Sequence, residues 1–259
     1  MYTLSVNAHR PLTSCLSGKH TVIDLTHTLS ETDPSDSTNG PHFSRVPTAT
    51  YPVNYYNKIS ISMPSGVGTT MDARLHAFPS GKTISDYTLE ELISPLVVLD
   101  VRSKVSADPD YFVTVDDIHD YERRYRRIPP GAMVVMKSGW YSKYRNETAY
   151  RSVETYVGPW GPTDTFHFPG FGTDAAQFLV NERDIHGIGV DTLSVDYGDT
   201  GRGPSPYGAH LAMLGADKYN LENLNLADPY IPASGACIGV YPTKILGAPE
   251  APARVVVYA

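Results

Sequence analysis

The feature that most constrains the fold of this chain is a set of short, strongly apolar runs rich in valine and isoleucine. Runs of about four to eight such residues, bounded by glycine, proline or polar residues, are typical of β-strands. They occupy residues 21–29, 57–63, 96–101, 132–140, 185–196 and 253–259. We expect the last four to be the better-buried strands, because their apolar residues are nearly continuous.

Helices are expected in only two places. Residues 114–128 begin with Thr114 as a cap, carry acids in the first turn and arginines in the last, and stop at Pro129. Residues 172–185 carry an apolar stripe at helical spacing. A mixed sheet with few helices places the chain in the α/β class. Because no composition break divides the 259 residues, we predict a single domain over residues 1–259.

Charge and composition limit the classes of binding partner and the cellular location that we expect. The net charge of -7 and the pI near 5.7 argue against nucleic acid and anionic membranes, since both need clustered lysine and arginine. No apolar run approaches the roughly 18 residues of a membrane span. Cys15 and Cys237 are too few for a disulfide framework, so we expect reduced thiols. Together these features predict a cytoplasmic protein.

One stretch almost completes a metal site. In "GVGTTMDARLH" (residues 66–76, the signature stretch), Asp72 and His76 lie four residues apart, but Gly66 and Thr70 stand where upstream imidazoles would bind a cation. Imidazole and carboxylate groups suit Zn²⁺ or Mn²⁺ and can also act as acid and base. By spacing alone, a structural His–Asp pair is the commoner explanation.

Two later residues add to the candidate site. His210 lies in "GPSPYGAHLAML" and Glu222 lies in "NLENLNL". Both stand near glycine-rich turns or predicted strand ends, where functional side chains often gather. Taken alone, Glu222 is equally well explained as a solvent-facing carboxylate.

The order of the segments resembles a known family. "VIDLTHTLSETDP", the signature stretch, "MVVMKSGW", "FPGFGTDAAQFLVNERDIHGIGVDTLSVD", "AHLAML", "NLENLNL" and "APARVVVYA" follow the order found in the cyclase-like, kynurenine formamidase-type metal-dependent hydrolases, which include isatin hydrolase. The resemblance covers nearly the whole chain. It implies the swivelling β/β/α cyclase-like fold and assembly as a homodimer or homotetramer.

The resemblance also implies roles. Asp72 matches the family's metal-binding aspartate, and His76 matches its general acid/base. His210 and Glu222 match the residues that hold a second metal together with that aspartate. His210 is also a candidate catalytic residue. We therefore expect a metal set of Asp72, His210 and Glu222.

The sequence departs from the family pattern mainly at the ligands of the first metal. Gly66 and Thr70 replace its two histidines, and Arg74 replaces the signature proline. Glycine has no donor atom and a threonine hydroxyl is a poor zinc ligand, so the first metal is expected to be absent. Either one Zn²⁺ or Mn²⁺ ion remains, or the site is metal-free with Arg74 supplying positive charge and a catalytic contact.

Aromatic residues predict the substrate contacts. Trp140, Phe168 and Phe171, with His167, lie in or beside a segment without clear periodicity, and Thr70 lies in the signature stretch. Long connections of that kind often form binding lids or oligomer contacts. We assign these five residues to binding a small aromatic or conjugated substrate. The alternative is that the rings pack the core or an interface between subunits.

Three functions are compatible with the sequence. The first is a hydrolase that opens a small amide, formamide, lactone or lactam, with His76 as general acid/base. The second is a metal-independent cyclase, lyase or isomerase that uses Asp72, Arg74, His76, His210 and Glu222. The third is a noncatalytic binding protein that keeps the fold.

Overall fold

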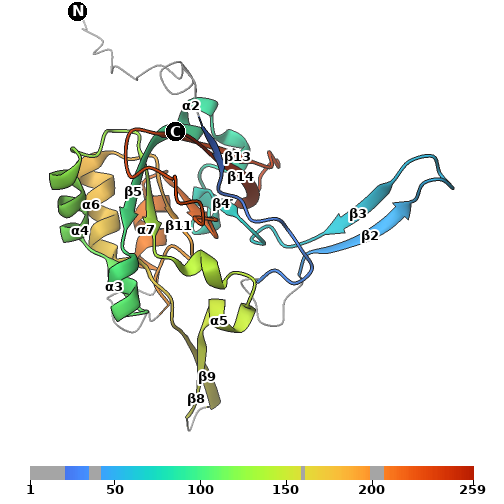
Figure 1. Cartoon of the computed structure of the whole chain (residues 1–259), viewed down its shortest axis with the longest axis horizontal. Helices are drawn as coiled ribbons and strands as arrows, with labels where there is room; N and C mark the ends of the chain where they lie inside the picture. Colours follow the sequence, from blue (N-terminus) through green and yellow to red (C-terminus); the bar gives the residue numbers. More distant parts are fainter. Residues whose placement is uncertain (1–20, 35–41, 159–160, 199–206) are drawn as a thin grey trace, which may run out of the picture.

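The computed structural model describes residues 21–34, 42–158, 161–198 and 207–259. Eight strands form one sheet, in which β14 pairs with β4 as well as with β13 and β1, so that seven strands close into a ring (Figure 1). In order, they are β1 (Val22–Asp24), β14 (Glu250–Tyr258), β13 (Cys237–Pro242), β5 (Ile93–Asp100), β7 (Met133–Lys137), β11 (Gly187–Val190), β12 (Tyr219–Glu222) and β4 (Thr70–Asp72).

The ring combines two kinds of pairing. Strands β5, β7, β11 and β12 are parallel neighbours, whereas β4, β14 and β13 make antiparallel pairs that complete the ring. Three of the parallel strands, β5, β7 and β11, are apolar runs that the sequence predicted as better buried. The fourth such run forms the antiparallel strand β14, whose burial alternates, and the parallel strand β12 was not predicted. The expected α/β class with a mixed sheet and few helices is confirmed.

Both faces of the ring are buried. Along β5, Leu96 and Val98 belong to the core enclosed by the ring (the ring core), and Val97 and Leu99 belong to a second core on the outer face. Helices α4 (Val115–Arg124) and α6 (Thr173–Arg183) cover that outer core (Figure 1). Each fully buried aliphatic side chain contributes about 1.5–3 kcal/mol, so this alternation strongly favours one register.

The remaining helices are short. They are α2 (Leu89–Leu92), α3 (Arg102–Ala107), α5 (Glu147–Arg151) and α7 (Gly208–Gly215), with the 3₁₀-helices η1 (Arg74–His76), η2 (Ile84–Asp86) and η3 (Trp140–Lys143). Two short strands, β6 (Phe112–Val113) and β10 (Gly170–Phe171), pair with each other over two residues. Helix α4 begins after Thr114 as predicted, because the Thr114 hydroxyl accepts from Asp117 N and the Asp117 carboxylate accepts from Thr114 N.

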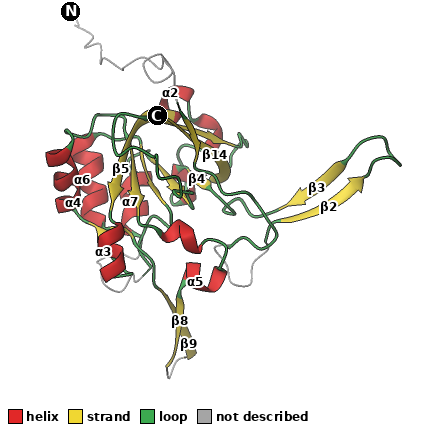
Figure 2. Cartoon of the chain, in the orientation of Figure 1, coloured by secondary structure: helices red, strands yellow, loops and turns green. Residues whose placement is uncertain are grey.

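Two hairpins leave the body of the protein (Figures 1 and 2). One joins β2 (Ser44–Ala49) to β3 (Lys58–Ser62), and the other joins β8 (Val153–Gly158) to β9 (Gly161–Phe166). The strand expected over 57–63 is thus present as β3, but Ile59 and Ile61 remain 48% and 55% exposed. Its apolar face is not covered by the core of this chain.

The structure bears on two predictions, the redox state of the cysteines and the lack of a membrane-spanning segment. Cys237 is disulfide-bonded, which corrects the prediction of a reduced thiol, because separation in sequence does not measure distance in the fold. Cys15 lies outside the described residues. Among the residues that the structure describes, no helix is both long and apolar enough to span a membrane.

Candidate functional site

Strand β4 carries part of the signature stretch and lies between two antiparallel neighbours. Pairing with β12 places Asp72 opposite Asn220 and Thr70 opposite Glu222. Pairing with β14 places Glu250 on the other side of Asp72. Directly paired residues project from the same face of a sheet. These polar side chains therefore gather on the outer face, while the residue between Thr70 and Asp72 belongs to the ring core.

Two short helices bring histidines over this face. His76 is the last residue of η1, which follows β4 directly, and His210 lies in the first turn of α7. Donor atoms of Asp72, His76 and His210 all lie within 4.8 Å of one another. The structure thus brings His210 to Asp72 and His76, which lie far from it in the sequence, and all three were candidates from the resemblance.

Asp196 holds His210 in place. Its carboxylate lies 2.6 Å from His210 Nδ1 and accepts from Ala209 N at 2.7 Å, so it caps α7 and positions the imidazole together. His210 Nε2 then lies 3.6 Å from Asp72 and 3.4 Å from Glu222. Burial lowers the pKa of His210, but the three carboxylates outweigh burial and raise that pKa well above its ordinary value.

The Glu222 carboxylate also interacts with the charges of His210 and Asp72. Its Oε1 accepts from Val195 N at 3.1 Å, which fixes the carboxylate beside His210. Burial and the neighbouring Asp72 carboxylate raise the pKa of Glu222 to about 7, against the lowering effect of His210. The cluster therefore needs a positive charge, which either a protonated imidazole or a bound cation can supply.

Buried polar atoms without partners mark the space for such a cation. Both carboxylate oxygens of Asp72 and the hydroxyl of Thr70 are buried and have no hydrogen-bond partner, and the same holds for both amide atoms of Asn220. Unpaired buried polar groups are rare and costly, so they point to an ion or water between them. The donor atoms of Asp72, His76 and His210 lie close enough together to fit one divalent cation, and Glu222, predicted as a ligand in place of His76, lies 3.4 Å from His210 Nε2.

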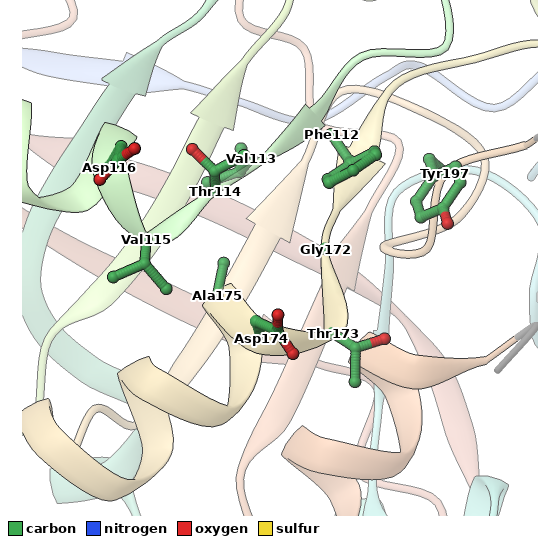
Figure 3. A pocket seen from close by; sticks show the side chains of 10 residues that line it. All are labelled: Phe112, Val113, Thr114, Val115, Asp116, Gly172, Thr173, Asp174, Ala175 and Tyr197. Atoms are coloured by element: carbon green, nitrogen blue, oxygen red, sulfur yellow. The ribbon is translucent and has the colours of Figure 1, made fainter. Parts of the chain in front are cut away.

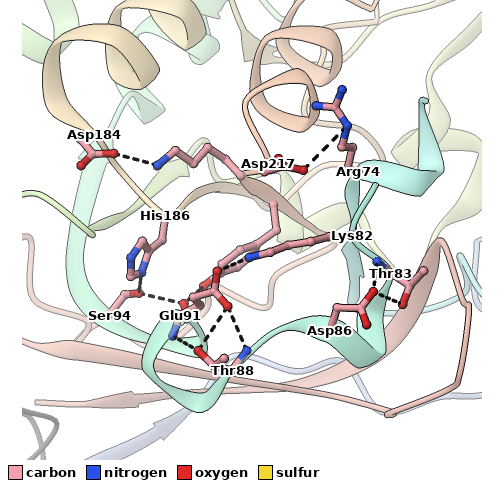
Figure 4. Close-up of polar contacts among 12 residues, drawn as sticks. Arg74, Lys82, Thr83, Asp86, Thr88, Glu91, Ser94, Asp184, His186 and Asp217 are labelled. Carbon is pink, nitrogen blue, oxygen red and sulfur yellow. Dashed lines mark hydrogen bonds and ion pairs between the residues drawn. The ribbon is translucent and has the colours of Figure 1, made fainter. Parts of the chain in front are cut away.

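Arg74 is placed elsewhere. Its guanidinium donates to the carbonyl oxygens of Leu214 and Gly215 at the end of α7, and it pairs with Asp217 at 3.8 Å (Figure 4). Cations stabilise helix carboxyl ends in this way. Among the described residues no contact joins Arg74 to Asp72, so its predicted catalytic contact is not supported by this geometry.

Most of the predicted substrate residues lie outside the cluster. Trp140, Phe168 and Phe171 are buried in the outer core, and Trp140 Nε1 donates to a backbone carbonyl at 2.8 Å. His167 Nδ1 lies 2.8 Å from Asp110 Oδ2. Only Thr70 faces the cluster. The alternative that these rings pack the core accounts for their placement, because aromatic side chains contribute large buried areas.

Two cavities lie away from these residues. One of about 350 Å³ opens between the starts of α4 and α6, where Thr114, Thr173 and Tyr197 line it (Figure 3). Another of about 520 Å³ is lined by His27 and Thr69 beside β14. Neither is lined by Asp72, so the cluster itself is the candidate site.

Sequence reasoning missed three residues of this site. Asp196 ends a predicted strand segment, which is a signal that could have marked it. Asn220 and Glu250 carry no such signal, since only strand pairing places them beside Asp72.

We expect Asp196→Ala to weaken binding of Mn²⁺ or Zn²⁺ by about 10- to 100-fold, because His210 loses the partner that orients it. Isothermal titration calorimetry measures this. Asp117→Ala is the matched control, since it removes an equivalent cap from α4 far from the cluster. Equal affinity in the Asp196 and Asp117 variants would contradict the assignment.

Comparisons with known proteins show the family and the fold of this chain. The family model described as "Putative cyclase" matches residues 23–197. Isatin hydrolase from Roseibium aggregatum is 31% identical over 192 residues, which cover 72% of this chain and 69% of that protein. The structure of isatin hydrolase A from Ralstonia solanacearum superposes with a TM-score of 0.83 at 29% identity, covering 92% of both chains.

A further isatin hydrolase structure, with the product analogue thioisatinate bound, superposes with a TM-score of 0.84 at 25% identity, covering 95% of both chains. The expected cyclase-like fold is confirmed by these superpositions. The extent of the family match and the identity to the Roseibium protein establish the relationship: this chain belongs to the cyclase family.

Proposed function

We propose that this chain is a metal-dependent hydrolase that opens a small cyclic amide or a related acyl bond. The observation that carries the proposal is the cluster of Asp72, His76 and His210, in which the buried Asp72 carboxylate has no hydrogen-bond partner. The relatives named as isatin hydrolases confirm the expectation of a hydrolase rather than a noncatalytic binding protein.

The residues of the cluster have two proposed roles, metal binding and proton transfer. Asp72, His210 and Glu222 would hold one Zn²⁺ or Mn²⁺ ion, since carboxylate and imidazole donors suit both. When bound there, a divalent cation would polarise a carbonyl oxygen and lower the pKa of a water molecule. His76, whose side chain is 36% exposed at the rim of the cluster, can take a proton from the attacking water and return it to the leaving nitrogen.

The position of Arg74 does not favour the metal-independent alternative. That alternative needs a permanent positive charge beside Asp72, but the guanidinium is engaged at the end of α7. A cation remains the simplest counter-charge for the buried carboxylates of Asp72 and Glu222.

The substrate we propose is small, planar and aromatic, as isatin is. This follows from the names of the relatives, one of which binds thioisatinate. A cytoplasmic location stays a prediction, and the disulfide at Cys237 argues against it because disulfides persist mainly in oxidising compartments.

We also propose that the chain forms a homodimer or homotetramer through the β2–β3 hairpin. Ile59 and Ile61, on one face of β3, are 48% and 55% exposed, and Tyr51 and Tyr55 near the turn are 66% and 86% exposed. An isolated two-stranded hairpin is marginally stable in water, so these exposed apolar residues favour burial against another subunit.

Removal of metal should abolish hydrolysis. We expect dialysis against a chelator to eliminate turnover of isatin or a related lactam, and Mn²⁺ or Zn²⁺ to restore it, because the carbonyl is no longer polarised. Elemental analysis of untagged protein should find about one ion per chain. Full turnover by the metal-free protein would exclude the proposal.

His76→Ala should reduce kcat by about a hundredfold or more and leave thermal stability nearly unchanged, because a partly exposed acid/base is lost without a core cavity. Steady-state kinetics and thermal unfolding check this. His119→Ala is the control, since His119 is also partly exposed and lies 3.8 Å from a glutamate. If the two variants retain equal turnover, His76 has no role in proton transfer.

The hairpin proposal has its own test. Ile59→Lys with Ile61→Lys should convert the oligomer to monomers, measured by light scattering after size-exclusion chromatography, because charges cannot be buried unpaired. Ser60→Lys with Ser62→Lys places the same charges on the opposite face of β3 and serves as the control. An unchanged mass in the isoleucine variant would contradict this interface.

A further inference from the structure

Gly66 is not required by its backbone conformation. Its φ lies outside the left-handed region, whereas Gly68, two residues later, has a φ of +80° that favours glycine. A residue with a side chain could therefore adopt the backbone found at position 66. The absence of a side chain there must be explained by what occupies the neighbouring space.

The Glu250 carboxylate occupies that space. A Cβ atom at position 66 would lie 3.1 Å from Oε2 and 3.4 Å from Oε1 of Glu250. Contacts this short are tighter than ordinary van der Waals packing, so even an alanine would push the carboxylate by a few tenths of an ångström. A side chain at position 66 would therefore displace the Glu250 carboxylate from its present position.

Glu250 is fixed in place and faces His76. It lies in the first position of β14, directly opposite Asp72 in the pairing with β4. Ser65 Oγ donates to its Oε1 at 2.7 Å, and its Oε2 lies 3.6 Å from His76 Nδ1. One carboxylate oxygen is thus anchored and the other is directed at the imidazole.

We propose that Glu250 is a positioning residue for His76, and that Gly66 provides the space for its carboxylate. This rests on the proposed role of His76 as general acid/base. Oε2 accepts the Nδ1–H of His76, and the ring is then held with Nε2 free to exchange protons with the reacting groups. Carboxylates orient imidazoles in this way in other catalytic and metal sites.

The distance fits such a pair. A separation of 3.6 Å is longer than a normal hydrogen bond, but catalytic hydrogen bonds are often long before substrate binds. The His76 side chain is 36% exposed, so a small rotation of the ring would close this distance. The loss of an imidazole at position 66 is therefore coupled to the gain of a carboxylate partner for His76.

The first test observes His76 without any substrate. Protein labelled with ¹⁵N-histidine is examined by NMR at a pH where the imidazole is neutral, and the His76 signals are identified with His76→Ala. We expect the wild type to carry the ring proton on Nδ1, and Glu250→Gln and Gly66→Ala to shift the ring toward the Nε2–H form. Glu90→Gln, an exposed glutamate in α2, should change nothing. Unchanged His76 signals in Glu250→Gln would overturn the proposal.

The second test is a double-mutant cycle on the hydrolysis of isatin. Gly66→Ala and Glu250→Ala should each lower kcat by about tenfold with little change in KM, and the double variant should be no slower than Glu250→Ala alone, because Gly66 acts only through Glu250. Additive losses would contradict the coupling.

Metal content separates positioning from metal binding. We expect about one ion per chain in Glu250→Gln as in the wild type. Loss of the ion in this variant would make Glu250 a ligand and overturn its role as a positioning residue. If isatin is not hydrolysed by the wild type while the His76 tautomer responds as expected, the proposed substrate fails and the Glu250–His76 pair stands.

Discussion

The site depends on the double pairing of β4. This three-residue strand pairs with β12 on one side and β14 on the other, and it thereby closes the ring of seven strands. Because paired residues project from one face, closure places carboxylates from three strands beside one another. The apolar residue between Thr70 and Asp72 packs into the ring core, so the register that buries it also sets the position of the site.

Gathering these carboxylates in a buried place is costly unless positive charge balances them. His210 supplies part of the balance, held by Asp196 on one ring nitrogen and facing Asp72 and Glu222 with the other. The oxygens of Asp72 have no hydrogen-bond partner among the described residues. A cation in this space would satisfy both their charge and their coordination, which would connect the packing of the ring to the proposed hydrolysis.

The altered signature stretch has a physical explanation at two of its three departures. Arg74 stabilises the end of α7, the helix that carries His210, through two carbonyl oxygens. Gly66 leaves room for Glu250, which reaches His76 from the neighbouring strand. Thr70 keeps a buried hydroxyl at the cluster without a protein partner. These three positions therefore lie beside the cluster of Asp72, His76 and His210 or support the helix that carries His210.

The sequence by itself determined the class of fold, because apolar runs with period two or nearly continuous burial can only be satisfied in a sheet covered on both faces. It also singled out Asp72, His76, His210 and Glu222 as candidates through their order along the chain, and the structure brings them together. The structure places Arg74 at a helix end and the rings of Trp140, Phe168 and Phe171 in the core, which spacing in the sequence does not reveal. The partnership of Gly66 with Glu250 was decided by tertiary structure alone, because 184 residues separate the two in the chain and only the pairing of β4 with β14 brings them together.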